Sequence, residues 1–353
     1  MSLPRLDQPF VVGSLTTAVG AVPLVSHELT WADLWGTFLA RANVRRMNYA
    51  VDPGLYALGS PNGNSPVLVT ANYKMSFDSL RKELSGRSAW ILVLDTKGIN
   101  VWCAAGKGTF STEELVERIR SSGLETVVSH RRLILPQLAG PGVAAHKVKE
   151  LSGFRVMYGP ILSSDLGQYI DMGFSATTDM RRKTFNTMER AILLPVELVE
   201  ALKGAVVISP IIFLLAGPGG PGGFWSNAVS YGAFAICAVL SAIVAGAVAT
   251  PILLPWLPGR AFALKGVVPG LAFATGLVSA RAYLWGNWPD RLETAAWLML
   301  IPALTTYLSM NFTGASTYTS LSGVRKEMRW ALPLQIAAVA VGLGLWLVSR
   351  FTA

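Results

Sequence analysis

The second half of this 353-residue chain is too apolar to fold as an ordinary water-soluble domain. After about residue 190 it holds five apolar stretches, each close to the roughly 20 residues that an α-helix needs to cross a bilayer. They run approximately over residues 199–217, 227–250, 263–285, 293–313 and 329–349. The sequence therefore predicts an all-α domain of five transmembrane helices over residues 191–353.

Basic residues between these stretches predict how the helices are oriented. Arg260 and Lys265 lie between the second and third stretches, and residues 325–329 add three more between the fourth and fifth. Because positively charged loops stay inside, we expect a multi-pass protein of the inner (cytoplasmic) membrane, with residues 1–190 in the cytoplasm and the C-terminus outside. The middles of the stretches are almost free of ionisable residues, which favours an anchor or docking platform over a transporter.

Charge and cysteine usage exclude several classes of protein. The formal net charge is +9 without any block of like charges, which indicates contact with a membrane surface rather than with nucleic acid. The two cysteines, Cys103 and Cys237, are far apart in sequence and do not make a disulfide framework, so a reducing compartment is expected. The N-terminus lacks the apolar segment of a signal peptide.

Residues 61–190 alternate between short strand-like and helix-like runs. Strands are expected at 67–70, 90–95, 126–129, 133–135 and 154–158, and helices at 76–84, 112–122, 142–151 and 164–172. This alternation predicts an α/β domain with a Rossmann-like, mostly parallel sheet covered on both faces. Ligands of such sheets bind beyond the carboxyl ends of the strands. A cofactor is therefore expected against residues 70–74, 95–107, 129–130, 136–142 and 159–160.

Residues 1–60 are predicted to be an N-terminal extension with one helix. Thr30 can cap a helix that runs from Trp31 to about Val44 and carries apolar residues at helical spacing, namely Trp31, Leu34, Trp35, Phe38 and Leu39. We expect this apolar face to pack on the following domain rather than to anchor in a membrane interface.

The connection after the strand at 90–95 is long for its type, and long loops in compact domains tend to be functional. Ser111 and Glu114 have the spacing of a capping box, so the next helix should begin near Thr112. Within the loop, the run Trp102–Ala105 can form a short helical turn that presents Cys103. Taken alone, this cysteine is a small buried residue, a nucleophile without a nearby histidine, or a thiolate ligand to a metal held by a cofactor. A zinc site is not supported, since the other cysteine lies in an apolar stretch.

The run Asn100–Lys107, with the sequence NVWCAAGK, resembles the cap-helix motif of the mercury-methylating corrinoid protein family (HgcA). The similarity extends to residues 72–74, 95–98, 133–138 and 154–160. Weaker versions of the last three also resemble the corrinoid domain of the corrinoid iron–sulfur protein of acetyl-CoA synthesis. The resemblance covers roughly residues 55–190 closely and the membrane tail in architecture.

This resemblance implies a cobalamin-type corrinoid bound base-off, with Cys103 as the catalytic residue and as the thiolate axial ligand of cobalt. Leu135–Ala139 and Tyr158–Pro160 would line the pocket for its lower nucleotide tail. Read without the resemblance, His130 is a polar loop residue, and Lys107 is as well placed to face water as to contact a cofactor. The full set of implied cofactor-binding residues is Thr70, Asn72, Asp95, Thr96, Gly98, Asn100, Val101, Trp102, Cys103, Ala104, Ala105, Gly106, Lys107, Ser129, His130, Leu135, Pro136, Gln137, Leu138, Ala139, Tyr158, Gly159 and Pro160.

The activity that the resemblance implies is a corrinoid-dependent methyltransferase that converts Hg(II) to methylmercury. An electrophile such as Hg(II) must receive the methyl as a carbanion equivalent or a radical, and an electron-rich thiolate opposite the methyl helps that transfer. Carbanion transfer leaves Co(III), and this chain lacks the cysteines to hold an iron–sulfur cluster. The resemblance therefore implies a ferredoxin-like partner with two 4Fe–4S clusters as electron donor and a tetrahydrofolate-dependent enzyme as methyl donor.

Two alternatives stay open at this point. The methyl acceptor can be another soft metal or a thiol, since mercury is rare and toxic. The chain can also be a non-catalytic membrane module that only binds a corrinoid, although the apolar bundle and the complete motif argue against it.

Overall fold

The structure is a computed structural model that describes residues 3–285, 288–315, 318–319 and 321–352. The chain divides into two compact units, Met1–Lys183 and Thr184–Ala353. We call them the sheet unit and the helical unit.

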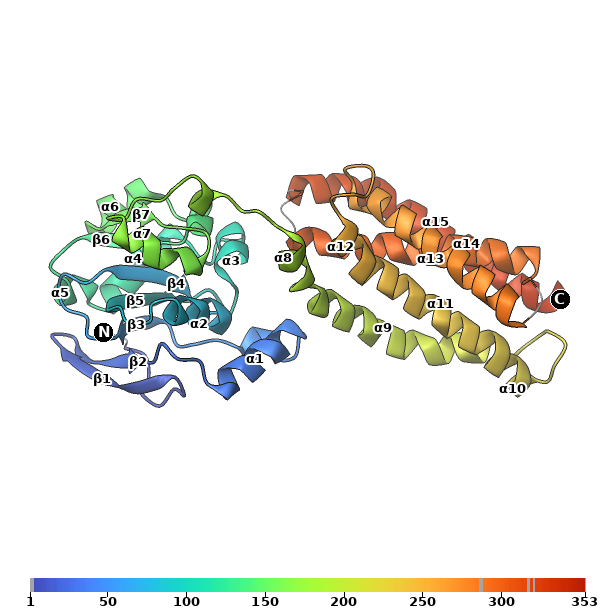
Figure 1. Cartoon of the computed structure of the whole chain (residues 1–353), viewed down its shortest axis with the longest axis horizontal. Helices are drawn as coiled ribbons and strands as arrows, with labels where there is room; N and C mark the ends of the chain where they lie inside the picture. The colour runs from blue at the N-terminus through green and yellow to red at the C-terminus, as the bar shows by residue number, and fades with distance from the viewer. Residues whose placement is uncertain (1–2, 286–287, 316–317, 320, 353) are drawn as a thin grey trace. The chain divides into compact units, whose positions relative to one another are not determined.

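The sheet unit is built on one mixed sheet of seven strands in the order β1-β2-β3-β5-β4-β6-β7 (Figure 1). β4, β5, β6 and β7 run parallel to one another, and β2 and β3 also pair in parallel. β3 runs antiparallel to β5, and β1 and β2 form an antiparallel hairpin. The strands are β1 (Val11–Thr17), β2 (Gly20–Val25), β3 (Gly54–Leu58), β4 (Val67–Ala71), β5 (Ala89–Leu94), β6 (Arg132–Leu135) and β7 (Arg155–Tyr158). Every residue of β3, β4 and β5 is buried, as expected for strands covered on both faces.

Helices cover both faces of this sheet. One apolar cluster packs α3 (Val101–Lys107), α4 (Thr112–Ser121) and α6 (Ala145–Ser152) against one face. A second cluster packs α2 (Lys74–Lys82) and α7 (Leu166–Asp171) against the other. The predicted α/β layering is therefore confirmed, with a mixed sheet in place of the mostly parallel one.

Four of the five predicted strands are confirmed as β4, β5, β6 and β7. The prediction of a strand at 126–129 is wrong, because this segment contributes to α5 (Leu124–Val127). Gly123 adopts φ 63°, and Thr126 Oγ1 donates to its carbonyl oxygen at 2.8 Å. The chain thus turns immediately after α4 and does not extend until β6.

Residues 1–60 contribute β1, β2 and β3 to the sheet, none of which the sequence analysis placed. The predicted helix is present as α1 (Trp31–Arg41). Its capping box forms in full, since Thr30 Oγ1 accepts from Asp33 N–H at 3.3 Å and the Asp33 carboxylate accepts from Thr30 N–H at 2.9 Å.

The expectation that the apolar face of α1 packs on the domain is wrong. Trp31, Trp35 and Phe38 are 77%, 51% and 58% exposed. The buried side of the helix carries Asp33 instead, and its carboxylate binds Lys74 of α2 at 2.5 Å. Leaving a buried charge without its partner destabilises a fold more than exposing an apolar side chain does. The buried ion pair therefore sets the orientation of α1.

The helical unit is built from helices. Those in the part of the chain that the structure describes are α8 (Thr187–Ala191), α9 (Leu194–Leu215), α10 (Phe224–Asn227), α11 (Ala233–Ile243), α12 (Thr250–Leu253), α13 (Phe262–Trp285), α14 (Arg291–Asn311) and α15 (Leu321–Thr352). Two π-helical segments, Ala228–Gly232 and Val244–Ala249, join α10, α11 and α12 into one rod. Among the described residues, four helical stretches are long and apolar enough to cross a membrane, namely Thr187–Leu215, Phe224–Leu253, Phe262–Leu284 and Ser322–Thr352.

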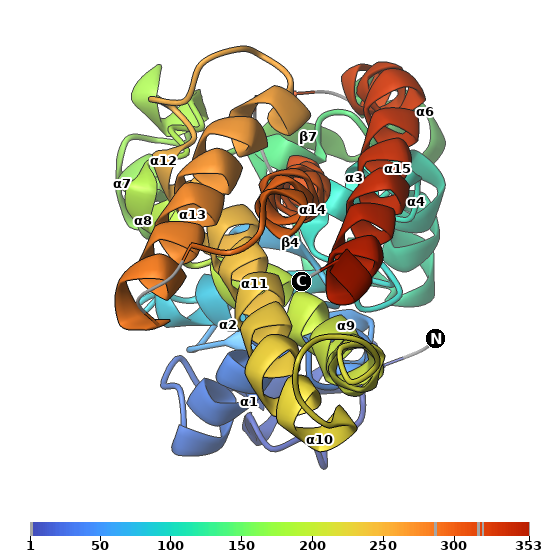
Figure 2. The same cartoon turned by 90° about the vertical axis from the view of Figure 1, so that its right-hand side faces the viewer.

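The fifth predicted span, at 293–313, is a helix, α14, but it is not among these four candidates, so the predicted count of five is not confirmed. Figure 2 shows α14 surrounded by α11, α13 and α15, all of which contact it. Its buried positions include Glu293, Thr305, Thr306 and Ser309. A helix shielded by its neighbours can carry polar residues that a lipid-facing helix would not.

Candidate functional site

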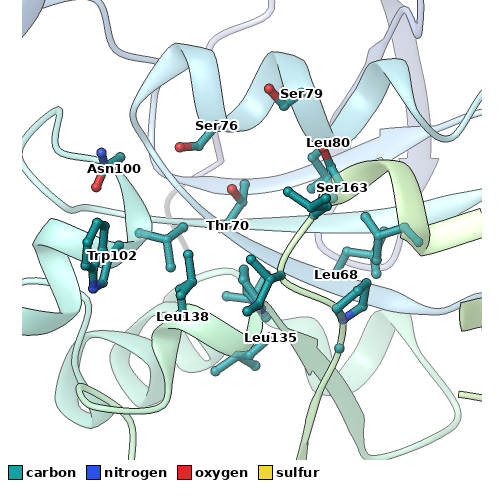
Figure 3. A pocket seen from close by; sticks show the side chains of 18 of the residues that line it. Leu68, Thr70, Ser76, Ser79, Leu80, Asn100, Trp102, Leu135, Leu138 and Ser163 are labelled. Carbon is teal, nitrogen blue, oxygen red and sulfur yellow. The ribbon is translucent and has the colours of Figure 1, made fainter. Parts of the chain in front are cut away.

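A pocket of about 380 Å³ opens where the parallel strands of the sheet unit end. β4, β6 and the residues after β7 form its floor, α2 forms one wall and the start of α3 forms another (Figure 3). The residues implied by the sequence that line it are Thr70, Asn100, Val101, Trp102, Leu135, Pro136, Leu138, Gly159 and Pro160. The rule that ligands bind beyond the carboxyl ends of parallel strands thus located the pocket correctly.

The sequence analysis expected a cofactor against Tyr73, within residues 70–74, but missed the rest of the α2 wall. This wall contributes Met75, Ser76, Ser79 and Leu80. The available signal was the spacing of Ser76 and Ser79, which lie three residues apart in a helix that begins directly after β4 and so share one face.

Four hydroxyl groups line the pocket without a partner. Those of Thr70, Ser76, Ser79 and Ser163 make no hydrogen bond with any residue that the structure describes. Opposite Ser76 and Ser79 the floor carries the apolar side chains of Leu135 and Leu138 (Figure 3). Such a mixture of apolar surface and a few polar groups is typical of a small-molecule site.

Cys103 lies in the first turn of α3, beside this pocket. The turn expected at Trp102–Ala105 is confirmed as part of a seven-residue helix that Gly108 ends at φ 79°. Asn100 caps the helix, since its Oδ1 accepts from Cys103 N–H at 2.9 Å. The three residues before Cys103 line the pocket and Cys103 itself is half-buried, so the cysteine sits next to the pocket wall.

The rest of the motif has a structural role. Ala104 and Ala105 lie on the buried side of α3. Gly142 packs closely against this side, since a Cβ added to it would lie 3.0 Å from Ala105 Cα. Larger side chains would push this close contact apart. Gly106 and Lys107 are exposed and lie outside the pocket lining.

Asn72, Thr96 and Gly98 shape the loop that leads into α3 instead of lining the pocket. Asn72 Oδ1 accepts from Thr96 N–H at 3.0 Å, from Thr96 Oγ1 at 2.8 Å and from Gly98 N–H at 3.0 Å. Gly98 has φ 69°, and a Cβ there would meet the carbonyl oxygen of Met47 at 2.6 Å. These residues position α3 without reaching the pocket.

Asp95 ties the end of β5 to α4. Its N–H donates to Glu114 Oε1 at 2.8 Å, so Glu114 does not close the expected capping box with Ser111. Only the first half of that box forms, with Ser111 Oγ accepting from Glu114 N–H at 3.2 Å, and α4 begins at Thr112 as predicted. Burial acts to raise the pKa of Asp95, but hydrogen bonds from Lys97 outweigh it and lower the pKa.

Ser129 and His130 are not brought to this pocket. Ser129 Oγ donates to Gly63 O at 2.8 Å, and a ring nitrogen of His130 contacts Ser65 O at 2.9 Å. Gly63 and Ser65 precede β4, so both side chains lie at the opposite edge of the sheet. The misplaced strand at 126–129 is the reason, because residues 129–130 precede a strand and do not follow one.

Gln137, Ala139 and Tyr158 lie behind the pocket lining. The Tyr158 hydroxyl donates to Val143 O at 2.6 Å, and burial raises its pKa. Ala139 is fully buried. Gln137 Oε1 is buried without a hydrogen-bond partner among the described residues, which leaves an unused acceptor directly between Pro136 and Leu138 of the lining.

Comparison with known proteins relates the part of the chain that carries this pocket to one group of proteins. Residues 43–170 match the family described as CO dehydrogenase/acetyl-CoA synthase delta subunit. The chain is 35% identical over 123 residues to the acetyl-CoA decarbonylase/synthase complex subunit gamma of Methanopyrus kandleri, across 34% of this chain and 26% of that protein. It is 34% identical over 128 residues to the subunit of the same name from Methanothermobacter thermautotrophicus, across 36% and 28%. The chain thus spans about a quarter of the length of the curated relatives it matches.

The matched region includes every residue of the pocket lining and Cys103. The similarity to the acetyl-CoA synthesis proteins, read first from residues 95–98, 133–138 and 154–160, is therefore supported. The resemblance to the mercury-methylating family stays a prediction, which rests mainly on the motif at 100–107.

Proposed function

We propose that this protein is a membrane-anchored, corrinoid-dependent methyltransferase that transfers a methyl group to Hg(II) and gives methylmercury. The observation that carries the proposal is the position of Cys103. It lies in a capped helical turn beside a pocket at the carboxyl edge of the sheet, within the region related to acetyl-CoA synthase subunits. The complete motif at 100–107 supports Hg(II) as the acceptor.

The residues present suit a corrinoid bound base-off. A pocket of about 380 Å³ accommodates the nucleotide tail of such a cofactor but not its macrocycle, which would lie outside against α3. Leu135 and Leu138 offer apolar contact to the tail, while Ser76 and Ser79 offer hydrogen bonds to its polar groups. When bound, the corrinoid supplies the cobalt that carries the methyl group.

Cys103 is the chain's contribution to the chemistry. A thiolate is a soft ligand that suits such a metal. With a corrinoid bound, it would donate electron density to the cobalt, which would favour methyl transfer to an electrophile. Asn100 and the Asn72 network hold the helix that carries this thiolate in one place.

The remaining parts of the proposal concern architecture and partners. The four parallel strands β5-β4-β6-β7 form a Rossmann-like core for the cofactor. α14 completes a five-helix anchor in the inner membrane, with the sheet unit in the cytoplasm and the C-terminus outside. A ferredoxin-like protein with two 4Fe–4S clusters supplies electrons, and a tetrahydrofolate-dependent enzyme supplies the methyl group.

A second candidate is a methyl carrier for another acceptor, such as a thiol or another soft metal. The names of the matched relatives, which concern acetyl-CoA decarbonylase/synthase complexes, favour this alternative. Competition between Hg(II) and such acceptors, measured with the purified full-length protein, separates the two.

The decisive test is spectroscopic. The full-length protein is purified from cells supplied with corrinoid, and its absorption and paramagnetic resonance spectra are recorded beside those of Cys103→Ala and Cys237→Ala. We expect a sulfur-ligated, base-off cobalt in the wild type and in Cys237→Ala, and loss of the sulfur ligand in Cys103→Ala. Cys237 is exposed on α11 and serves as the matched control. A folded wild type without corrinoid, or an unchanged spectrum in Cys103→Ala, would contradict the proposal.

A further inference from the structure

The side of α1 that faces away from the sheet is a continuous apolar surface. Four side chains at helical spacing are exposed, and two more follow just beyond the helix. They are Trp31 (77%), Leu34 (49%), Trp35 (51%), Phe38 (58%), Val44 (43%) and Met47 (61%). We call these six residues the α1 face. The rings of Trp35 and Phe38 stack with their centroids 5.2 Å apart, so part of the surface is already ordered.

α1 cannot rotate to hide this face. Its opposite side is held by Asp33, which binds Lys74 at 2.5 Å and Arg81 at 2.8 Å. The Tyr49 hydroxyl donates to the carbonyl oxygen of Asp33 at 2.9 Å, and a Cβ at Gly36 would come 2.6 Å from the Tyr49 ring. The exposure of the apolar side is therefore built into the fold, and large exposed apolar patches mark interaction sites.

The connection between the two units favours a membrane as the partner of the α1 face. The sheet unit ends at Lys183, and the helical segment that follows carries Glu197, Glu200 and Lys203 before it becomes wholly apolar. The candidate membrane stretch Thr187–Leu215 begins a few residues after the sheet unit ends, so the connection between them is short. The bilayer that this stretch would enter is therefore within reach of the sheet unit.

Charge favours the same partner. Arg41, Arg45 and Arg46 lie within the second half of the α1 face in sequence, and none of them forms an ion pair with a residue that the structure describes. Arg45 is exposed, whereas Arg41 and Arg46 are half-buried beside Tyr73. Tryptophan beside arginine is the composition of segments that lie in the interface of a membrane. Anionic lipid headgroups attract such basic clusters.

We propose that the α1 face inserts into the headgroup interface of an anionic bilayer, as a second membrane contact of this protein. The aromatic side chains enter the boundary between headgroups and acyl chains, and Arg45, with the charges of Arg41 and Arg46 nearby, pairs with lipid phosphates. This contact is independent of what the pocket binds. It holds the sheet unit against the membrane instead of leaving it free on its tether.

The test uses the full-length protein in nanodiscs of phosphatidylcholine and phosphatidylglycerol. Both native cysteines are replaced by serine, and a spin label is attached through Leu34→Cys or, as a control on the exposed surface of α6, through Glu150→Cys. Accessibility to oxygen reports lipid, and accessibility to a water-soluble nickel chelate reports water. We expect the label at position 34 to be reached by oxygen and shielded from nickel, and the label at position 150 to show the reverse.

Each other outcome at position 34 overturns the proposal. A label reached by nickel lies in water, and a label shielded from both probes is covered by protein. The charge argument is tested separately with Arg41→Gln/Arg45→Gln and with discs of phosphatidylcholine alone. Both should raise nickel accessibility at position 34, and no change in either would exclude anionic lipid as the partner. Circular dichroism confirms that the labelled variants are folded.

Discussion

The sheet unit and the helical unit both bury charged side chains, but they balance them differently. In the sheet unit Asp33 and Asp78 face Lys74 and Arg81, with Asp78 accepting from Lys74 at 2.7 Å and from Arg81 at 2.8 Å. Two acids thus meet two bases, and every one of these side chains is at least 90% buried.

In the helical unit Glu293 of α14 faces two arginines. Arg281 of α13 donates to one carboxylate oxygen, and Arg350 of α15 donates to the other at 3.2 Å. Arg350 lies 3.5 Å from the centroid of the Tyr231 ring, whose face offers further attraction to a cation. One acid joins three helices here, at one end of the bundle.

Both clusters of charged residues hold helices together, but only one of them supports the site. The cluster of Asp33, Asp78, Lys74 and Arg81 joins α1 to α2, and α2 is a wall of the pocket. The helical cluster joins α13, α14 and α15, which carry no residue of the pocket lining. The four predictions below test this division, beginning with the largest effect.

The largest difference in activity is expected between substitutions of the two cysteines, one in each unit. Cys103→Ala should reduce methylmercury formation to the background rate, because it removes the thiolate proposed as cobalt ligand. Cys237→Ala should keep a rate near that of the wild type, since its side chain is exposed on α11. The assay uses membranes with Hg(II), a methyl donor and a reductant. Equal activity of both variants would place the chemistry elsewhere.

The buried acids should differ in the cost of their removal. Deleting one partner of a buried ion pair costs about 3–5 kcal/mol. Asp78→Ala should fall at the lower end, because Asp33 still contacts both Lys74 and Arg81. Glu293→Ala should reach the upper end, because two buried arginines lose the acid that joins them. Hydrogen exchange of peptides from α2 and α14 measures each unit separately, and the opposite ranking would contradict this account.

Substitutions of two asparagines at opposite edges of the sheet should have different effects. Asn72 supports the site, whereas Asn62 stabilises only a surface turn. Asn72→Ala leaves the N–H groups of Thr96 and Gly98 unsatisfied near α3 and should cost about 3 kcal/mol, with weaker corrinoid retention. Asn62→Ala removes an exposed turn contact, the 2.9 Å bond from Asn64 N–H, and should cost less than about 1 kcal/mol. Unfolding in denaturant and the corrinoid content after gel filtration provide the comparison. Equal corrinoid loss in both variants would remove the special role of Asn72.

Low pH should weaken the cluster of Asp33, Asp78, Lys74 and Arg81 within a defined pH range. Burial acts to raise the pKa of Asp33, but hydrogen bonds from Lys74 and from Thr30 N–H, with the charge of Arg81, outweigh it and lower the pKa to about 2. A carboxylate with a depressed pKa stabilises the fold above its unfolded pKa and loses that contribution as pH falls through its folded pKa. We expect about 2 kcal/mol of stability to be lost between about pH 4 and pH 2. Asp33→Asn should abolish this part of the pH dependence of hydrogen exchange in α1 and α2.

Local signals predicted much of the site. The start of α3 and the first turn that carries Cys103 follow from residues within a few positions of each other, as Asn100 and Cys103 show. The same holds for α1, where Thr30 and Asp33 cap one another. Glu114 shows the limit of such signals. Its spacing from Ser111 indicated a capping box, but the end of β5 offered Asp95 N–H as a competing donor.

Features that depend on contacts between distant segments were missed by the sequence analysis. Ser76 and Ser79 form a pocket wall only because β4 lies between β5 and β6 in the sheet. Ser129 and His130 lie at the far edge because one predicted strand became α5. A strand order and a change of direction depend on pairing between distant segments, which the pattern of a single segment does not contain.

By itself the sequence determined the apolar tail, the four parallel strands and a helical turn around Cys103, since hydropathy, strand propensity and capping act over neighbouring residues. Only the tertiary structure decided that α1 shows its aromatic side and buries its charges, and that α14 lies within the bundle. The physical reason is that a buried charge needs a partner, and that partner, Lys74 for Asp33 or Arg350 for Glu293, lies 41 or 57 residues away.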